Sequence, residues 1–182
     1  MAMLDRDHTD FIGVDALIEA NANQLVQFRT FAQNRDWQSF HSNHYDWWAF
    51  PIDANSGHGD RFNVAPALGE LRQNSEFLSA VLENAQLLAI GLGYDLATGQ
   101  IIDPARADHY AVRLYKCGRA LHLWGMPVAH HAFMGCVEYL LKDHRDLAKT
   151  LDGMRATETP ELNPLGIDLE LVTGSQHPRE TI

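Results

Sequence analysis

Cysteine is scarce in this sequence, because Cys117 and Cys136 are the only two among 182 residues. Two cysteines are too few for the disulfide framework that stabilises many small secreted domains. We therefore expect a reducing, cytoplasmic environment in which both cysteines act as small buried apolar residues. Residues 1–10 contain three aspartates and no apolar core, so we also expect no signal peptide there.

Long apolar runs and basic residues are also in short supply. No run approaches the ~18–20 residues that a bilayer-spanning helix needs, so we expect no membrane association. The chain has 14 Lys and Arg against 24 Asp and Glu, which gives a formal net charge of −10. This excess of negative charge argues against general binding to nucleic acids or to anionic membrane surfaces.

Apolar residues, in contrast, are plentiful at 46% of the chain, which is enough for one packed core. Their spacing is mostly three and four residues, and strand signals are few. We therefore predict an all-α fold, a compact bundle or array of about five helices, over residues 1–153. Residues 154–182 contain several Pro and Gly and are predicted to form an irregular C-terminal tail, packed on the domain or trailing it.

Capping residues set the predicted helix boundaries. Asp15 is the expected N-cap of the first helix, and Asp103-Pro104 supplies a cap and a first helical residue for a later one. Gly93 is expected to end the helix before it. Residues 52–63 are predicted as a loop, and a second loop is predicted through Thr98 and Gly99. The predicted helices are residues 15–31, 66–71, 75–92, 103–124 and 127–152.

Ten histidines raise the question of a metal site. No Glu is followed by His at the third position, as a di-iron helical site requires, and the zinc-protease pattern His-Glu-x-x-His is absent. The chain also lacks a Gly-x-Ser-x-Gly nucleophile motif. We therefore predict no metal, no cofactor and no catalytic residue. A small metal-assisted enzyme stays open as an alternative, with the following candidate residues: His41, His44, His109, His130 and His131.

An aromatic cluster precedes Pro51. It contains Tyr45, Trp47, Trp48 and Phe50, and the Trp and Tyr side chains combine a large apolar area with one polar group each. Two interpretations remain open. The cluster either forms a plug that docks a short helix onto the bundle, or it lines a pocket or partner surface.

A basic stretch is the second unusual feature. Residues 109–137 contain no acidic side chain, yet Arg113, Lys116 and Arg119 occur there at three-residue spacing, with His109 about one turn earlier. Such a group of cations could hold a carboxylate, a phosphate or an acidic tail. Alternatively, the cations pair with Asp and Glu of neighbouring helices, or they solvate one face.

Both features lie in segments that resemble a known family. Tyr45-Asp46-Trp47-Trp48-Ala49-Phe50-Pro51 resembles the Tyr-Ile-Gln-Trp-Leu-Phe-Pro signature of the opioid growth factor receptor conserved region, although Asp46 and Trp47 depart from it. Residues 63–68 resemble the family's Asn-then-Ala-Pro-Leu stretch, and residues 83–94 resemble its next helix. Asp108-His109 with Arg113 and Lys116 resembles its Asn-His and Leu-Arg-Ile-Thr-Arg-Ile motif. The four blocks occur in the family's order.

The resemblance implies an all-α domain. Animal members of the family are receptors for an enkephalin peptide and act at the nucleus, but they carry long regions that this chain lacks, so their function does not transfer with the fold. We predict a non-enzymatic binding or interaction domain for a protein, a peptide or a small anionic ligand. A structural assembly subunit is a further alternative, and the oligomeric state is left open. The predicted ligand-binding residues are Tyr45, Trp47, Trp48, His109, Arg113 and Lys116.

Overall fold

The computed structural model describes residues 10–42, 44–55, 59–106 and 111–143, and most of these residues are helical. The all-α prediction is therefore confirmed. Within the described ranges the α-helices are α1 (Val14–Asn34), α2 (Trp37–Ser42), α3 (Asp46–Ala49), α4 (Leu68–Leu71), α5 (Ser75–Gly91), α6 (Ala111–Leu123) and α7 (Pro127–Asp143). Two single-turn 3₁₀-helices accompany them, η1 (Ala65–Ala67) and η2 (Pro104–Arg106). The predicted tail at 154–182 and the predicted helix end near residue 152 lie outside the described residues.

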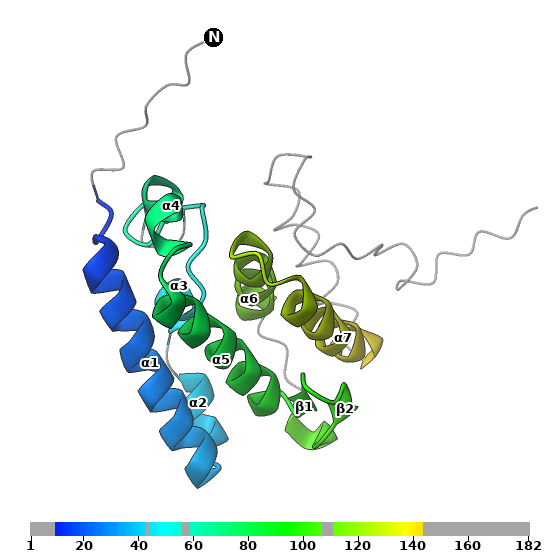
Figure 1. Ribbon diagram of the computed structural model, residues 1–182. Coiled ribbons are helices and arrows are strands. Elements are labelled where there is room, and N and C mark those ends of the chain that lie inside the picture. Colours follow the sequence, from blue (N-terminus) through cyan, green and yellow to red (C-terminus); the bar gives the residue numbers. More distant parts are fainter. Residues whose placement is uncertain (1–9, 43, 56–58, 107–110, 144–182) are drawn as a thin grey trace, which may run out of the picture.

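Helix α5 lies at the centre of the domain. Figure 1 shows α1 along one side of α5 and the pair α6 and α7 on the other side, in agreement with the contacts between these helices. Helices α2 and α3 pack against α1. Among the described helices, none is long and apolar enough to cross a membrane. The largest wholly buried core side chains include Leu17, Phe28, Phe40, Tyr45, Phe50, Phe77, Leu88, Leu114, Leu121 and Phe133.

The sequence of α5 explains its position. Val81, Ala85 and Leu88 recur at helical spacing and form one completely buried stripe. Ala80 and Ala89 lie on opposite sides of this stripe and are buried as well, so the helix can contact neighbours on more than one side. Asn74 caps its first turn, because its side-chain oxygen accepts a hydrogen bond of 2.9 Å from the Phe77 backbone N–H. The predicted helix over residues 75–92 therefore agrees with the observed one to within one residue.

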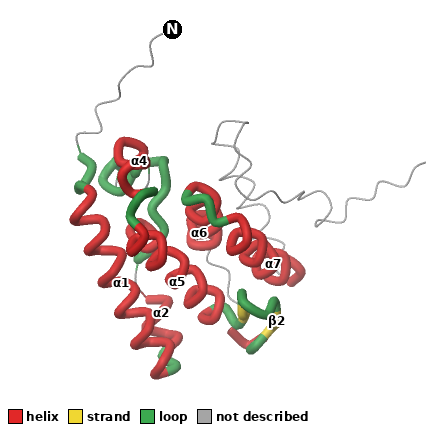
Figure 2. Tube along the Cα trace, viewed as in Figure 1, coloured by secondary structure: helices red, strands yellow, loops and turns green. Residues whose placement is uncertain are grey.

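The predicted loop through Thr98 and Gly99 is the turn of a small antiparallel hairpin, whose strands β1 (Tyr94–Asp95) and β2 (Gln100–Ile101) were not predicted (Figure 2). The Asp95 carboxylate organises its turn by accepting hydrogen bonds from the Ala97 backbone N–H and the Thr98 hydroxyl, both at 2.9 Å. These bonds also lower the pKa of Asp95. The prediction missed the hairpin because each strand has only two residues, too short for an alternating pattern.

One predicted N-cap and one predicted helix start were also wrong. The N-cap of α1 is Gly13. Asp15 lies inside the first turn, where its negative charge interacts favourably with the positive end of the helix dipole. Asp103 does cap a turn, accepting a 3.1 Å hydrogen bond from the Ala105 backbone N–H. That turn is the 3₁₀-helix η2, however, and not the first turn of a continuous helix to residue 124.

Candidate functional site

The aromatic segment around α3 has an inner and an outer part. Tyr45 is completely buried and packs edge-on against Phe28, with ring centroids 4.6 Å apart. Phe50 is also completely buried and contacts Tyr45. Trp47 and Trp48 are only partly buried. The plug interpretation therefore describes Tyr45 and Phe50, whereas the two tryptophans reach the surface.

Helix α1 fixes the position of Trp48. The Asn21 amide donates hydrogen bonds to the Trp48 carbonyl at 2.8 Å and to the Ala49 carbonyl at 3.1 Å, which satisfies two carbonyls of the four-residue helix α3. One turn further along α1, Gln24 accepts a 3.0 Å hydrogen bond from the Trp48 indole Nε1. Backbone and side chain of Trp48 are thus both held by amide side chains of α1.

Helix α6 holds the same segment from the other side. Arg113 donates a 3.0 Å hydrogen bond to the His41 carbonyl, and its guanidinium carbon lies 4.6 Å from the centroid of the Tyr45 ring. Lys116 Nζ lies 3.3 Å from Asp46 Oδ2 and 5.4 Å from the Trp47 ring centroid. Both cations therefore combine a polar partner with an aromatic one.

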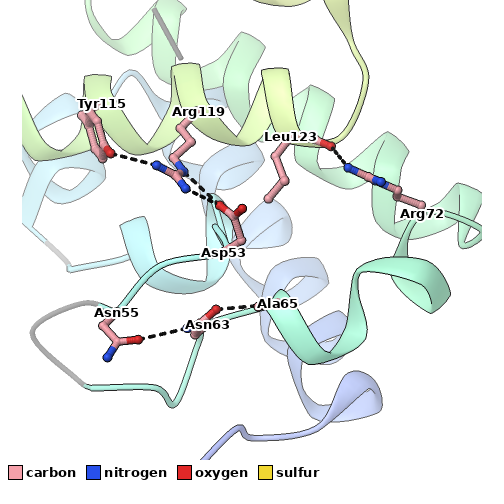
Figure 3. Close-up of polar contacts among 8 residues, drawn as sticks. All are labelled: Asp53, Asn55, Asn63, Ala65, Arg72, Tyr115, Arg119 and Leu123. Atoms are coloured by element: carbon pink, nitrogen blue, oxygen red, sulfur yellow. Dashed lines mark hydrogen bonds and ion pairs between the residues drawn. The ribbon is translucent and has the colours of Figure 1, made fainter. Parts of the chain in front are cut away.

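Arg113, Lys116 and Arg119 form a row of cations on α6, termed the α6 row. Arg119 is the member of this row that reaches the loop after α3. Its Nε and one terminal nitrogen donate to the same Asp53 carboxylate oxygen, at 3.0 and 2.5 Å, and its other terminal nitrogen donates to the Tyr115 hydroxyl at 3.2 Å (Figure 3). A second link joins α4 to the end of α6, because Arg72 donates a 3.0 Å hydrogen bond to the Leu123 carbonyl. The loop following α3 is thus anchored to α6 as well.

The three cations of this row are almost inaccessible, with exposed fractions of 6% for Arg113, 6% for Lys116 and 7% for Arg119. Asp46 is 3% exposed. Burial lowers the pKa of Lys116, and the neighbouring Asp46 carboxylate opposes that effect. For Lys116 and Arg119 the geometry corresponds to the alternative in which the basic stretch pairs with carboxylates inside the protein. Arg113, Lys116, Tyr45 and Trp47 are brought together, whereas His109 lies outside the described residues.

A cleft of about 390 Å³ opens beside the outer edge of the aromatic segment. Trp48 and His44 form one wall, and the exposed residues Asn23 and Gln27 lie on the other wall with the buried Gln24. The three amide residues come from consecutive turns on one face of α1. The side-chain nitrogen of Gln24 has no hydrogen-bond partner among the described residues. The cleft therefore combines an indole, an imidazole and three carboxamides.

A second cleft, of about 490 Å³, lies between α5, the hairpin and the start of α7. Its walls are mainly apolar, and Val128 at its rim is 83% exposed. Leu82, Leu96 and Met126 are among the apolar residues that line it. Gln86 is the polar side chain among the residues that line this cleft.

In the part of the chain that the structure describes, no three His, Cys, Asp or Glu residues gather as metal ligands do. His122 on α6 and His130 on α7 have ring centroids 5.6 Å apart, far along the chain from His41 and His44. Burial raises the pKa of Cys136 to about 12 and that of Cys117 well above its usual range. Neither thiol is therefore prepared to act as a nucleophile.

Sequence reasoning missed the carboxamides Asn23, Gln24 and Gln27 and the partner carboxylates Asp46 and Asp53. One signal for the amides was present. Gln24 lies within the apolar periodicity of α1, where a polar residue must find a buried partner. The carboxylates gave no such signal, because Asp53 and Arg119 are 66 residues apart in the chain.

Comparison with known proteins adds no assignment. No family model matches the chain, and neither a curated protein nor a solved structure shows significant similarity to it. The resemblance to the opioid growth factor receptor conserved region therefore stays a prediction, carried by the four sequence blocks alone.

Proposed function

We propose that this protein is a non-enzymatic binding domain that recognises uncharged segments of a partner protein or peptide in the cleft beside Trp48. The observation that carries the proposal is the fixed indole of Trp48 facing carboxamides from one side of α1. The described residues that line the cleft include no Asp, Glu, Lys or Arg. Its chemistry therefore favours a ligand with hydrogen-bonding groups and no formal charge.

Peptide backbone suits this chemistry. Each carboxamide presents both N–H donors and a carbonyl acceptor, as a peptide group does. Asn23 and Gln27 are exposed and free to reorient toward a ligand, whereas Gln24 is held by Trp48. Tryptophan supplies a large rigid contact area at small entropic cost, and this is why it is frequent in binding sites.

In this proposal Arg113 and Lys116 are positioning residues. They are too deeply buried to offer a ligand much surface, but they hold the segment that carries the tryptophans. The predicted ligand-binding residues therefore have different roles in this proposal. Trp48 contacts the ligand, Trp47 borders the site, and Tyr45, Arg113 and Lys116 keep both tryptophans in place.

Fluorine NMR of the protein labelled with 5-fluorotryptophan tests the proposal. The four tryptophans, at positions 37, 47, 48 and 124, give separate reporters that single Trp→Phe variants assign. The probes are pools of short peptides, acetylated and amidated at their ends, with neutral, acidic or basic side chains. The neutral pool is expected to shift the Trp48 signal in a saturable way. The signal of Trp124, which is 5% exposed and packs on Phe77, should not move.

The double variant Asn23→Ala/Gln27→Ala provides the matched test, because both side chains are exposed and their removal should leave the fold intact. It is expected to weaken neutral-peptide binding at least about tenfold. Unchanged binding in this variant, or a Trp48 signal that no peptide pool moves, would refute the proposal.

A further inference from the structure

A third cleft, of about 590 Å³, lies where the end of α1 meets the start of α2, the end of α5 and η2. Its walls carry two arginines, Arg35 and Arg106, and one carboxylate, Asp103. Trp37, Ile90 and Ile102 supply apolar surface. In a protein with an overall charge of −10, this cleft is locally cationic.

Arg35 occupies an unfavourable backbone conformation at the rim of this cleft. Its φ of 55° and ψ of 29° place it in the left-handed region, and within the described ranges it is the one residue other than glycine with a positive φ. The hydrogen bonds from Arg35 N to the Ala32 carbonyl and from Asp36 N to the Phe31 carbonyl, at 3.1 and 2.9 Å, complete a helix C-terminal motif. Glycine is the usual residue at this position, because other side chains are strained there.

Arg106, on the opposite wall, is held in place by two contacts. Its guanidinium carbon lies 4.4 Å from the centroid of the Trp37 ring, and its Nε lies 3.2 Å from Asp103 Oδ2. Stacking on the indole sets the plane of the guanidinium, and the ion pair with Asp103 keeps it beside η2, although the buried Nε makes no hydrogen bond to a described residue. The two terminal nitrogens carry the N–H groups that remain for an anion, in the fork geometry that fits carboxylate and phosphate.

The backbone beneath Arg106 is built around Gly93. The Gly93 carbonyl accepts hydrogen bonds from the backbone N–H groups of Ile102 and Asp103, at 2.8 and 3.2 Å. A β-carbon on Gly93 would lie 2.0 Å from the Asp103 carbonyl oxygen, so no other residue fits at this point. The end of α5 therefore sets the position of η2, and with it the position of Arg106.

We propose that this cleft binds a small organic anion. Its carboxylate or phosphate lies between Arg35 and Arg106, and its apolar body rests against Trp37, Ile90 and Ile102. The proposal rests on an arginine that occupies a glycine position beside a second, pre-oriented arginine, and it is independent of the peptide-binding function proposed above. A strained residue that the fold does not need is the kind of feature that marks a functional site.

Phenyl phosphate is the first probe, because it joins a doubly charged head to an apolar ring. Its binding to the full-length protein is measured by NMR through the Trp37 indole N–H signal, at constant ionic strength. Benzoate tests whether a carboxylate is accepted in place of phosphate. Inorganic phosphate and benzyl alcohol test the head and the apolar body separately.

The expected result is saturable binding of phenyl phosphate or benzoate, at least about tenfold tighter than binding of inorganic phosphate or benzyl alcohol. The decisive variant is Arg35→Gly. It removes one guanidinium and restores the favoured residue, so the anion affinity should fall at least about tenfold while the midpoint of thermal unfolding stays the same or rises. This variant therefore separates a loss of binding from a loss of stability.

Arg61→Ala is the matched control. Arg61 is also exposed, and its carbonyl accepts a 3.0 Å hydrogen bond from Ile12 N near the opposite end of α1, a helix about 30 Å long. Like Arg35→Gly, the Arg61→Ala variant removes one positive charge, but it should leave the anion affinity unchanged. The proposal is overturned if neither organic anion binds, if inorganic phosphate or benzyl alcohol binds as tightly, or if Arg35→Gly and Arg61→Ala weaken binding equally.

Discussion

Arginine and lysine meet carboxylates in two different settings in this domain. On the face of α6, Lys116 pairs with Asp46 and Arg119 with Asp53, and both cations are almost inaccessible. On the other side of α5, Arg29 of α1 pairs with Glu83 through two hydrogen bonds of 2.6 Å. The side chains of this second pair are 51% and 36% exposed. The distances do not follow burial, because the buried pairs measure 3.3 Å for Lys116–Asp46 and 2.5 Å for Arg119–Asp53, on either side of the exposed pair.

The comparison shows that distance alone is a poor guide to what an ion pair does. An exposed pair exchanges hydration for a contact of similar strength, and salt screens it. A buried pair has lost its hydration, so each partner depends on the other, and breaking the pair leaves an uncompensated charge. The α6 row therefore determines where the aromatic segment lies, whereas the Arg29–Glu83 pair only reinforces the packing of α1 on α5.

The largest effect is expected from Lys116→Met. Removing the ammonium leaves the Asp46 carboxylate buried without its counter-charge, so the free energy of unfolding should fall by about 3–5 kcal/mol. Urea denaturation monitored by circular dichroism measures this change.

The double variant Asp46→Leu/Lys116→Met is the control for this prediction. With both charges replaced by apolar groups, most of the lost stability should return, because neither charge is left unpaired. A double variant that is as unstable as the sum of its single changes would contradict the interpretation of a mutually dependent buried pair.

Arg119→Met is expected to be intermediate. It removes two hydrogen bonds to Asp53, but the Asp53 side chain is 22% exposed and can recover some hydration, so a loss of about 1.5–3 kcal/mol is expected. Tyr115→Phe removes only the bond between the tyrosine hydroxyl and Arg119 and should cost less. Equal losses in the two variants would show that the carboxylate contact contributes little.

The smallest effect is expected from Arg29→Met on the exposed pair. The loss of stability should be smaller than for either buried pair, and it should shrink further as NaCl is raised from about 0.05 to about 1 M. The buried Lys116→Met variant should keep its full deficit over the same range. A salt-independent effect at Arg29 would remove the contrast between the two settings.

Low pH should remove the contribution of the exposed Arg29–Glu83 pair to stability. The hydrogen bond from Arg29 lowers the pKa of Glu83 below its ordinary value of 4.5. A carboxyl whose pKa is lower in the folded state adds stability that is complete above the unfolded pKa and disappears as pH falls through the folded pKa. The stability difference between wild type and Glu83→Gln should therefore be constant near neutral pH and vanish in acid. A difference that persists at low pH would show that the contribution is not electrostatic.

Local patterns in the sequence were enough to predict much of the fold. The apolar stripe of α5, its end near Gly93 and the start of α7 at Pro127 all depend on residues within a few turns of one another. The hairpin and the 3₁₀ turn at 104–106 could not be predicted in this way. They exist because Gly93, Ile102 and Asp103 meet through backbone hydrogen bonds, and no local residue pattern records such a meeting.

In the candidate site, too, features that depend on residues near one another in the sequence could be predicted, and contacts between distant residues could not. The basic stretch at Arg113 and Lys116 was recognisable, and internal pairing was one of its two interpretations. Choosing between the interpretations required knowing that Asp46 faces Lys116, a contact that the spacing of residues on α6 does not contain. Trp48 was also recognisable, but its neighbour Gln24 belongs to a helix 24 residues earlier.

The α6 row also has a consequence for the order in which the chain folds. Arg113 meets the His41 carbonyl across 72 residues of sequence, and Arg119 meets Asp53 across 66. Until α6 has been synthesised, the segment around α3 has its carboxylates but not their counter-charges, and water is their better environment. Helices α1 and α5 can pair before that point, but Asp46 and Asp53 gain their counter-charges only afterwards. Such long-range contacts carry a loop-closure cost and slow folding. We therefore expect the contacts between α6 and the segment around α3 to be among the last of the domain to form.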